Sequence, residues 1–277
     1  MTRIPRRLAG TAALGLALAA GFAGAAPATA AAGAIHPGVM TLTAGAQCTA
    51  NFVFTSSAGT FIGQAAHCSG TGGATETNGC DAGSLPLGTK VEVDGATQPG
   101  TLVYNSWLAM QAANETDPNT CQYNDFALIK IDPADVASVS PEIPVLGGPT
   151  GIDRDGVGTG EDVFSYGNSS LRLGIEQLSP KQGLSLGTDS EGWNHPVYTL
   201  TPGIPGDSGS AFVNSEGQAL GILSTLALAP LAGSNGVSDL AKSLDYANAK
   251  GGLGTITLSQ GGAFDGNLPI VRGLLGS

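Results

Sequence analysis

Three stretches of this chain contain residue types that could together support nucleophilic catalysis. Ser208 lies in the run 206–210, where glycine and other small residues would let the backbone approach a substrate carbonyl. A serine hydroxyl is a weak nucleophile until a neighbouring base takes its proton, and that base must itself be oriented by a carboxylate. His67, which ends an apolar run, and Asp125, which precedes the apolar run 126–129, are the candidates for these two roles.

The order of these residues along the chain narrows the class of protein. His67 comes first, Asp125 second and Ser208 third, as in chymotrypsin-type peptidases and unlike subtilisins or α/β-hydrolases. With the three motifs in this order, the chain resembles the chymotrypsin-like (trypsin-like) serine peptidase family in its secreted bacterial form, over roughly residues 37–249. The resemblance implies polypeptide substrates and a site that uses no cofactor and no metal ion.

The resemblance also assigns a role to each residue of the site. His67 would take the proton of the Ser208 hydroxyl as it attacks a carbonyl carbon to form an acyl-enzyme, and Asp125 would hold the imidazole tautomer. The backbone N–H groups of Gly206 and Ser208 would form the oxyanion hole. Ser224 matches the serine that donates a hydrogen bond to the triad carboxylate in this family.

A substrate pocket follows from the same resemblance. Pro202 stands six residues before Ser208, where trypsin-like members carry an acid, and Thr225 and Leu226 occupy the pocket wall. A buried Lys or Arg side chain would lack a carboxylate partner there, which costs several kcal/mol. We therefore expect cleavage after small or medium apolar residues, because Leu226 would narrow the pocket.

Asp207, directly before the nucleophile, needs a cationic partner in this family. Animal relatives bury a new N-terminus against this aspartate, but Ile35 lies too few residues before Cys48 to reach it. An internal arginine is therefore expected to pair with Asp207, and Arg154 and Arg172 are the candidates.

The four cysteines, Cys48, Cys68, Cys80 and Cys121, are expected to form disulfides, since their number is even and the chain carries an export signal. Three pairings are possible from the sequence. The family resemblance favours Cys48 with Cys68, which leaves Cys80 with Cys121. A zinc site is the competing use of four cysteines, but the chain has no Cys-x-x-Cys pair.

Residues 1–30 have the pattern of a secretory signal peptide. Three arginines precede an apolar run over 8–26, and small residues at 28 and 30 fit the cleavage rule. A membrane anchor is the alternative, but the run is rich in alanine and glycine and no stop-transfer flank follows. The sequence thus predicts a secreted, extracellular protein that has no membrane segment after the signal is removed.

The charge of the chain excludes nucleic-acid binding. Its formal net charge is −11, and removal of the three arginines in 1–30 leaves eight basic side chains against 22 acidic ones, or about −14. No basic patch is available to neutralise phosphates. We expect an acidic monomer.

Glycine punctuates the sequence, with 43 residues in 277, and the segments between glycines are short and rich in β-branched and aromatic residues. We expect strands at 51–54, 60–66, 90–93, 101–104, 126–131, 163–166, 197–200, 210–213 and 218–223. One helix is expected at 238–251, with Ser238 as N-cap and glycines at its end. The fold class is all-β, and the resemblance implies two six-stranded antiparallel Greek-key barrels with a C-terminal helix.

The expected boundaries follow from this pattern. The N-terminal barrel would span 36–145 and the C-terminal barrel 155–237, with a Pro- and Gly-rich junction near 143–155. The tail 252–277 extends past the usual end of the family fold and contains a candidate strand at 255–258.

The leading interpretation is a serine endopeptidase, a hydrolase. A catalytically silent barrel that only binds is the alternative from another class, but all three triad residues are present. A serine esterase is a third option, disfavoured because Gly-x-Ser-x-Gly is absent around residue 208.

Overall fold

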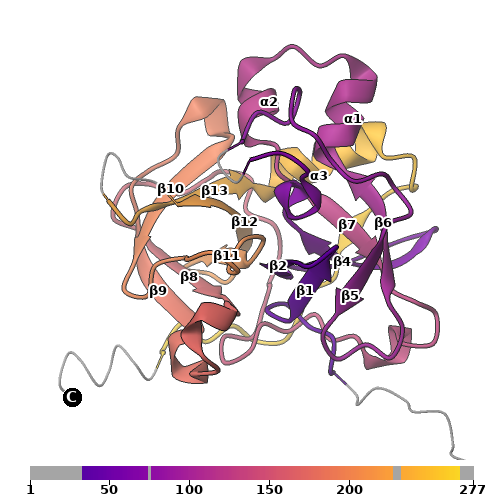
Figure 1. Cartoon of the computed structure of the whole chain (residues 1–277). Coiled ribbons are helices and arrows are strands. Elements are labelled where there is room, and N and C mark those ends of the chain that lie inside the picture. The colour runs from indigo at the N-terminus through magenta and orange to yellow at the C-terminus, as the bar shows by residue number, and fades with distance from the viewer. Residues whose placement is uncertain (1–32, 74–75, 227–231, 269–277) are drawn as a thin grey trace, which may run out of the picture.

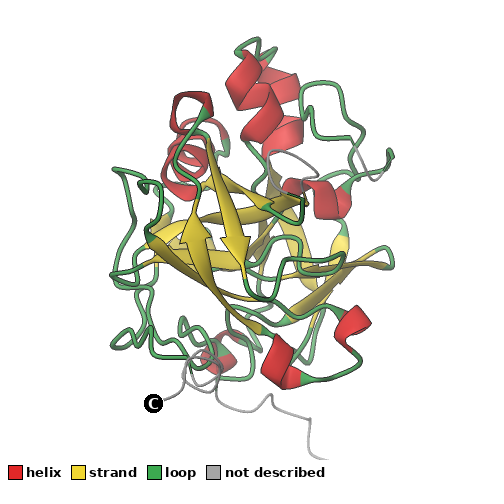
Figure 2. Ribbon diagram, turned by 90° about the vertical axis from the view of Figure 1, so that its left-hand side faces the viewer, coloured by secondary structure: helices red, strands yellow, loops and turns green. Residues whose placement is uncertain are grey.

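The computed structural model describes residues 33–73, 76–226 and 232–268. It contains two β units that lie side by side, with the helices α1, α2 and α3 grouped at the top of the view (Figure 1). Seen from the side, the strands occupy the centre of the molecule and the helices its periphery (Figure 2). No helix in the described ranges is long and apolar enough to cross a membrane.

The first unit is an antiparallel sheet of eight strands. In spatial order they are β14 (Thr257–Leu258), β3 (Val53–Ser56), β4 (Gly59–Gln64), β7 (Ala127–Lys130), β6 (Gly100–Asn105), β5 (Lys90–Val93), β1 (Met40–Thr43) and β2 (Ala46–Thr49). Strands β4 and β7 are buried on both faces, because Phe61 and Leu128 lie in one core cluster and Ile62 and Ile129 in another. The tail strand β14 pairs with β3, so the C-terminal tail completes the edge of the N-terminal sheet.

The second unit is a closed antiparallel barrel of six strands. Their order is β10 (Asn194–Thr199), β13 (Asn235–Asp239), β12 (Ala219–Leu226), β11 (Ala211–Asn214), β8 (Asp162–Tyr166) and β9 (Pro180–Ser185). Its interior is lined by Val163, Val197, Phe212 and Leu223. The expected all-β architecture of two antiparallel units is confirmed, although the first sheet has eight strands where six were expected.

Helix α3 (Leu240–Lys250) is the expected C-terminal helix, with a different cap. The carboxylate of Asp239 accepts a hydrogen bond from the Lys242 N–H, so Asp239 is the N-cap, whereas Ser238 lies within β13. An aspartate at this position also places negative charge near the positive end of the helix dipole. The helix ends at Gly251, as expected.

Two further helices, α1 (Ser106–Ala113) and α2 (Pro118–Tyr123), were not expected from the sequence. Their N-caps are Asn105 and Asp117, whose side chains accept hydrogen bonds from backbone N–H groups in the first turn. Each helix is only about two turns long, which is too short for an apolar period to stand out. The capping residues were the available signal.

Candidate active site

The first sheet brings His67 and Asp125 to the same edge. His67 lies in the 3₁₀ turn Ala66–Ser69 that follows β4, and Asp125 lies two residues before β7. Strands β4 and β7 are antiparallel neighbours in which Gln64 pairs with Ala127. Because the end of one strand therefore meets the start of the other, residues 58 positions apart in the chain come into contact.

The Asp125 carboxylate holds His67 by two hydrogen bonds. Its Oδ1 accepts from the backbone N–H of His67 at 2.9 Å, and its Oδ2 pairs with the ring Nδ1 at 2.6 Å. The Ser224 hydroxyl donates to the same Oδ2 at 2.6 Å from the other β unit. With Nδ1 as the protonated nitrogen, Nε2 is left with a lone pair that can accept a proton.

Burial and charge oppose each other in this pair. Burial would raise the pKa of Asp125, but the charge of His67 and the hydrogen bonds from His67 and Ser224 outweigh it, so the pKa lies below its ordinary value. Burial would lower the pKa of His67, but the charge and hydrogen bond of Asp125 outweigh that effect and raise it. Asp125 is thus a carboxylate, and it stabilises the imidazolium form of His67.

Ser208 lies at the junction of the two β units, in the turn before β11. Its carbonyl oxygen accepts a hydrogen bond of 2.8 Å from the N–H of Thr49, beside Cys48 in the first sheet. The next residue, Gly209, donates to the carbonyl of Leu223, which precedes Ser224. These bonds tie the Ser208 turn to β2, whose Cys48 is bonded to the turn of His67, and to β12, whose Ser224 donates to Asp125. Among the described residues, the Ser208 hydroxyl itself forms no hydrogen bond, including none to His67.

Two glycines of the turn are required by close backbone approach. Gly209 has φ of +88°, and a Cβ there would lie 2.6 Å from the carbonyl oxygen of Thr49. Gly206 has φ of +96°, and its carbonyl oxygen accepts a hydrogen bond of 2.8 Å from the Thr49 hydroxyl. In the part of the chain that is described, the N–H groups of Gly206 and Ser208 donate to no protein acceptor. Both are therefore available to a ligand.

Asp207, which lies between Gly206 and Ser208 in the chain, is fully buried and is held by two cations. Its Oδ2 lies 2.5 Å from Nη2 of Arg172 and 2.9 Å from Nζ of Lys181, and both cationic side chains are at least nine-tenths buried. Of the two arginines expected from the sequence, Arg172 makes this pair, whereas Arg154 pairs with Asp245 at the surface. Lys181 gave no signal in the sequence, because a single lysine in a short strand is ordinarily exposed.

The two cations change the ionisation of the cluster. Burial would raise the pKa of Asp207, but the charge and the hydrogen bond of each cation, Lys181 and Arg172, outweigh it and hold the pKa below its ordinary value. Burial, together with the positive charge of Arg172, lowers the pKa of Lys181 to about 8, although Asp207 opposes the change.

Of the expected pocket residues, Pro202 contacts this cluster. The carbonyl of Pro202 accepts a hydrogen bond of 3.0 Å from Arg172. Asn235 links the segment after Pro202 to the expected wall residue Thr225, because it bonds both backbone groups of Gly203 and donates to the carbonyl of Thr225. Leu226 ends β12 with half of its surface exposed, and the following residues, 227–231, lie outside the described part of the chain.

Disulfides join Cys48 to Cys68 and Cys80 to Cys121, the two pairs expected from the sequence. The first links β2 to the turn that carries His67, and the second links the following loop to α2, shortly before Asp125. Ligand atoms of Cys48, Cys68 and His67 gather within 4.8 Å, the kind of group that could hold a metal. The sulfurs are bonded to each other, however, so they have no thiolate to offer a metal ion.

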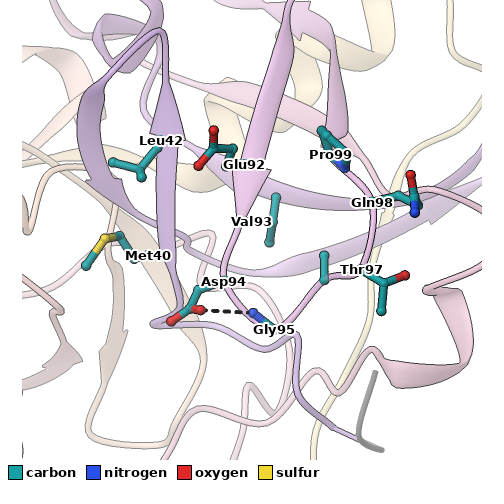
Figure 3. A pocket seen from close by; sticks show the side chains of 10 residues that line it. Met40, Leu42, Glu92, Val93, Asp94, Gly95, Thr97, Gln98 and Pro99 are labelled. Carbon is teal, nitrogen blue, oxygen red and sulfur yellow. Dashed lines mark hydrogen bonds between the residues drawn. The ribbon is translucent and has the colours of Figure 1, made fainter. Parts of the chain in front are cut away.

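A hollow with a volume of about 620 Å³ lies away from these residues. It extends along β1, β5 and the loop after β5 (Figure 3). None of the candidate catalytic residues lines it. Its walls are Met40, Leu42, Glu92, Val93, Asp94, Gly95, Ala96, Thr97, Gln98 and Pro99.

Comparison with solved structures identifies the fold. Protease A of Thermobifida fusca superposes on 82% of this chain and 99% of its own, with a TM-score of 0.54 and 17% identity. The chain has the chymotrypsin-like fold. The chymotrypsin of Cellulomonas bogoriensis, at 14% identity, superposes on 81% of this chain and 98% of its own, with a TM-score of 0.51. A glutamic acid specific serine protease that uses a histidine triad in substrate binding has a TM-score of 0.50 at 16% identity, over 81% of this chain and 100% of its own.

No protein-family model matches the sequence, and a search of curated proteins finds no match. At these identities the chymotrypsin-like fold is what the superpositions show. Within that fold, His67 and Asp125 lie on the first β unit and Ser208 and Ser224 on the second. The candidate site therefore lies between the two β units of the chymotrypsin-like fold.

Proposed function

We propose that this protein is a secreted serine endopeptidase that hydrolyses peptide bonds through His67, Asp125 and Ser208. The observation that carries the proposal is the Asp125 carboxylate, which binds Nδ1 of His67 at 2.6 Å and also accepts from Ser224. A buried carboxylate placed in this way orients the imidazole and stabilises its charged form, which is what a general base acting on a serine requires.

The chemistry assigned to the site has two steps. Nε2 of His67 accepts the Ser208 proton as the oxygen attacks the carbonyl carbon, and the imidazolium then protonates the leaving amine to give an acyl-enzyme. Water attacks the acyl-enzyme with His67 again as base. The N–H groups of Gly206 and Ser208, which bind no protein acceptor among the described residues, donate to the oxyanion in both steps.

The charges behind the pocket disfavour a cationic P1 residue. Arg172 donates to the carbonyl of Pro202 and Lys181 to that of Thr201, so two cations and one carboxylate lie behind the floor. An arginine or lysine side chain entering the pocket would meet a net positive charge. Small or medium apolar side chains are the class that we propose.

A histidine-based recognition of glutamate is not available to this chain. It has three histidines in all, of which His67 belongs to the proposed triad. His195 is fully buried, and its two ring nitrogens bond to Thr188 and Asp239. The remaining His36 cannot supply three rings by itself.

A silent binding protein is the second candidate, and the unbonded Ser208 hydroxyl is the observation in its favour. Hydrogen bonds of this type are often absent in substrate-free sites and form only with substrate, so we favour the enzyme. A fluorophosphonate probe distinguishes the two: we expect stoichiometric labelling at Ser208 of the secreted protein and none in Ser208→Ala. A protein that is folded yet unlabelled would support the binding function.

Activity on a diverse peptide library then tests the substrate class. We expect cleavage within peptides, after uncharged P1 residues. Hydrolysis of simple esters without any peptide cleavage would indicate an esterase instead, and a preference for Arg or Lys would contradict the assignment of the pocket. Secretion, a monomeric state and polypeptide partners belong to the same proposal, and N-terminal sequencing and light scattering of the exported protein test them.

A further inference from the structure

The peptide between Pro205 and Gly206 controls one donor of the oxyanion hole. In a trans peptide the C=O and N–H groups point in opposite directions. This peptide is trans, since the cis bond in the described chain is Gly148–Pro149. Whatever holds the carbonyl of Pro205 therefore sets the direction in which the Gly206 N–H points.

Ser169 holds that carbonyl. Its hydroxyl donates to the carbonyl oxygen of Pro205 at 2.5 Å, across 36 residues of chain. The hydroxyl oxygen of Ser169 also accepts a hydrogen bond of 3.2 Å from the N–H of Leu171, so the hydroxyl proton is directed to Pro205. Ser169 is 3% exposed, so water does not readily compete for this bond.

Ser169 is in turn fixed by the buried charge cluster. Its backbone N–H donates to Oδ1 of Asp207 at 3.0 Å, and Oδ2 of Asp207 is held by Arg172 and Lys181. The contact with the turn is close, because a Cβ on Gly206 would lie 3.0 Å from the Ser169 oxygen. Ser169 is thus anchored on one side by the carboxylate next to the nucleophile and bonded on the other side to the oxyanion-hole peptide.

We propose that Ser169 is a positioning residue, which keeps the Gly206 N–H directed away from Ser169 and into the oxyanion hole. The inference rests on the proposed function, since it concerns a donor of that site. Without the hydroxyl, the carbonyl of Pro205 loses this partner, and rotation of the peptide would turn the carbonyl oxygen toward the hole and remove the Gly206 donor.

The test compares Ser169→Ala with Ser56→Ala. Ser56 is a matched control, because its hydroxyl also donates to a distant carbonyl, that of Leu253, and accepts from the N–H two residues later. Loss of one oxyanion-hole donor lowers kcat by about 10²–10³. We expect Ser169→Ala to lower kcat by about 10- to 100-fold with KM within about twofold, and Ser56→Ala to leave both unchanged.

Two further measurements separate positioning from a general loss of structure. A peptide aldehyde, whose adduct places an oxygen in the hole, should bind Ser169→Ala more weakly by about the same factor as the loss in kcat. A crystal structure of the variant should show the Pro205 carbonyl rotated. If the alanine variant does not fold, Ser169→Cys, whose thiol donates only weakly, should show the same loss of kcat.

The outcomes distinguish this inference from the proposed function. Unchanged kcat and aldehyde affinity in Ser169→Ala, with active wild-type protein, would overturn the role of Ser169 alone. Wild-type protein that neither cleaves peptides nor reacts with a fluorophosphonate would overturn the proposed function. In that case the crystal structure of Ser169→Ala still decides whether Ser169 holds the peptide, since an unrotated carbonyl would refute it.

Discussion

Replacing Lys181 with methionine removes one of the two cations that bind Asp207 and keeps an unbranched side chain in the same buried place. The carboxylate retains Arg172, so the cluster changes from one excess positive charge to a neutral pair. The variant loses the hydrogen bonds of Nζ to Asp207 and to the carbonyl of Thr201. Removal of the buried charge should stabilise the fold and loss of the hydrogen bonds should destabilise it, and the balance between the two depends on pH.

The magnitude follows from the pKa of Lys181, which the fold lowers from 10.5 to about 8. Each pKa unit corresponds to about 1.4 kcal/mol, so the charged form costs the folded protein roughly 3 kcal/mol at neutral pH. Between pH 8 and the ordinary pKa of lysine, the unfolded chain binds this proton and the folded protein does not. Raising the pH through this window therefore stabilises the wild-type fold, and Lys181→Met lacks this gain.

At pH 7 the variant escapes the cost of the buried charge, but its lost hydrogen bonds cancel about 1–3 kcal/mol of that gain. We therefore expect Lys181→Met to exceed the wild type in stability by about 0–2 kcal/mol at pH 7. At about pH 10 the wild-type lysine is neutral in the folded protein, so only the lost hydrogen bonds distinguish the two proteins and the wild type should be the more stable. Urea unfolding at a series of pH values, with the disulfides intact, measures the difference. Lys90→Met, at an exposed lysine, is the control. Parallel stability curves for wild type and Lys181→Met from about pH 7 to 10 would refute the reasoning.

Three further predictions concern the triad and the disulfides. Ser208→Ala, His67→Ala and Asp125→Asn should each abolish most hydrolysis without unfolding the protein, and the Ser208/His67 double variant should be no less active than either single one, as kcat measurements would show. Because the pKa of His67 is raised and the base must be neutral, kcat/KM should fall as the pH is lowered through a value above that of an ordinary histidine, which a pH profile measures. Replacing both Cys80 and Cys121 by serine removes a disulfide that spans a sequence separation of 41 residues. The free energy of unfolding, measured by urea titration, should fall by about 4 kcal/mol. A loss below about 1 kcal/mol would contradict the chain-entropy estimate.

Features that are encoded locally could be predicted from the amino-acid sequence. Short apolar segments separated by glycines predicted strands, and an even number of cysteines, together with the expected export signal, predicted bridges. The small residues around Ser208 and the chain order of His67, Asp125 and Ser208 indicated the class of chemistry. Each of these signals lies within a few neighbouring residues or in the order of motifs.

Some local structure was missed because its signals are weak. Helices α1 and α2 are about two turns long, so no periodic apolar face identified them, although Asn105 and Asp117 are favourable caps. The candidate strand at 255–258, in contrast, was expected, and it is present at 257–258, where it pairs with the edge of β3.

The support of the site, in contrast, depends on tertiary contacts. Lys181 and Ser169 have ordinary sequence surroundings, yet Lys181 reaches Asp207 from strand β9 and Ser169 reaches Pro205 across 36 residues of chain. Strand pairing and barrel closure place them there, and the low dielectric of the interior makes their charges and hydrogen bonds matter. Contacts of this kind depend on which segments fold against each other, and a single sequence carries no local mark of that choice.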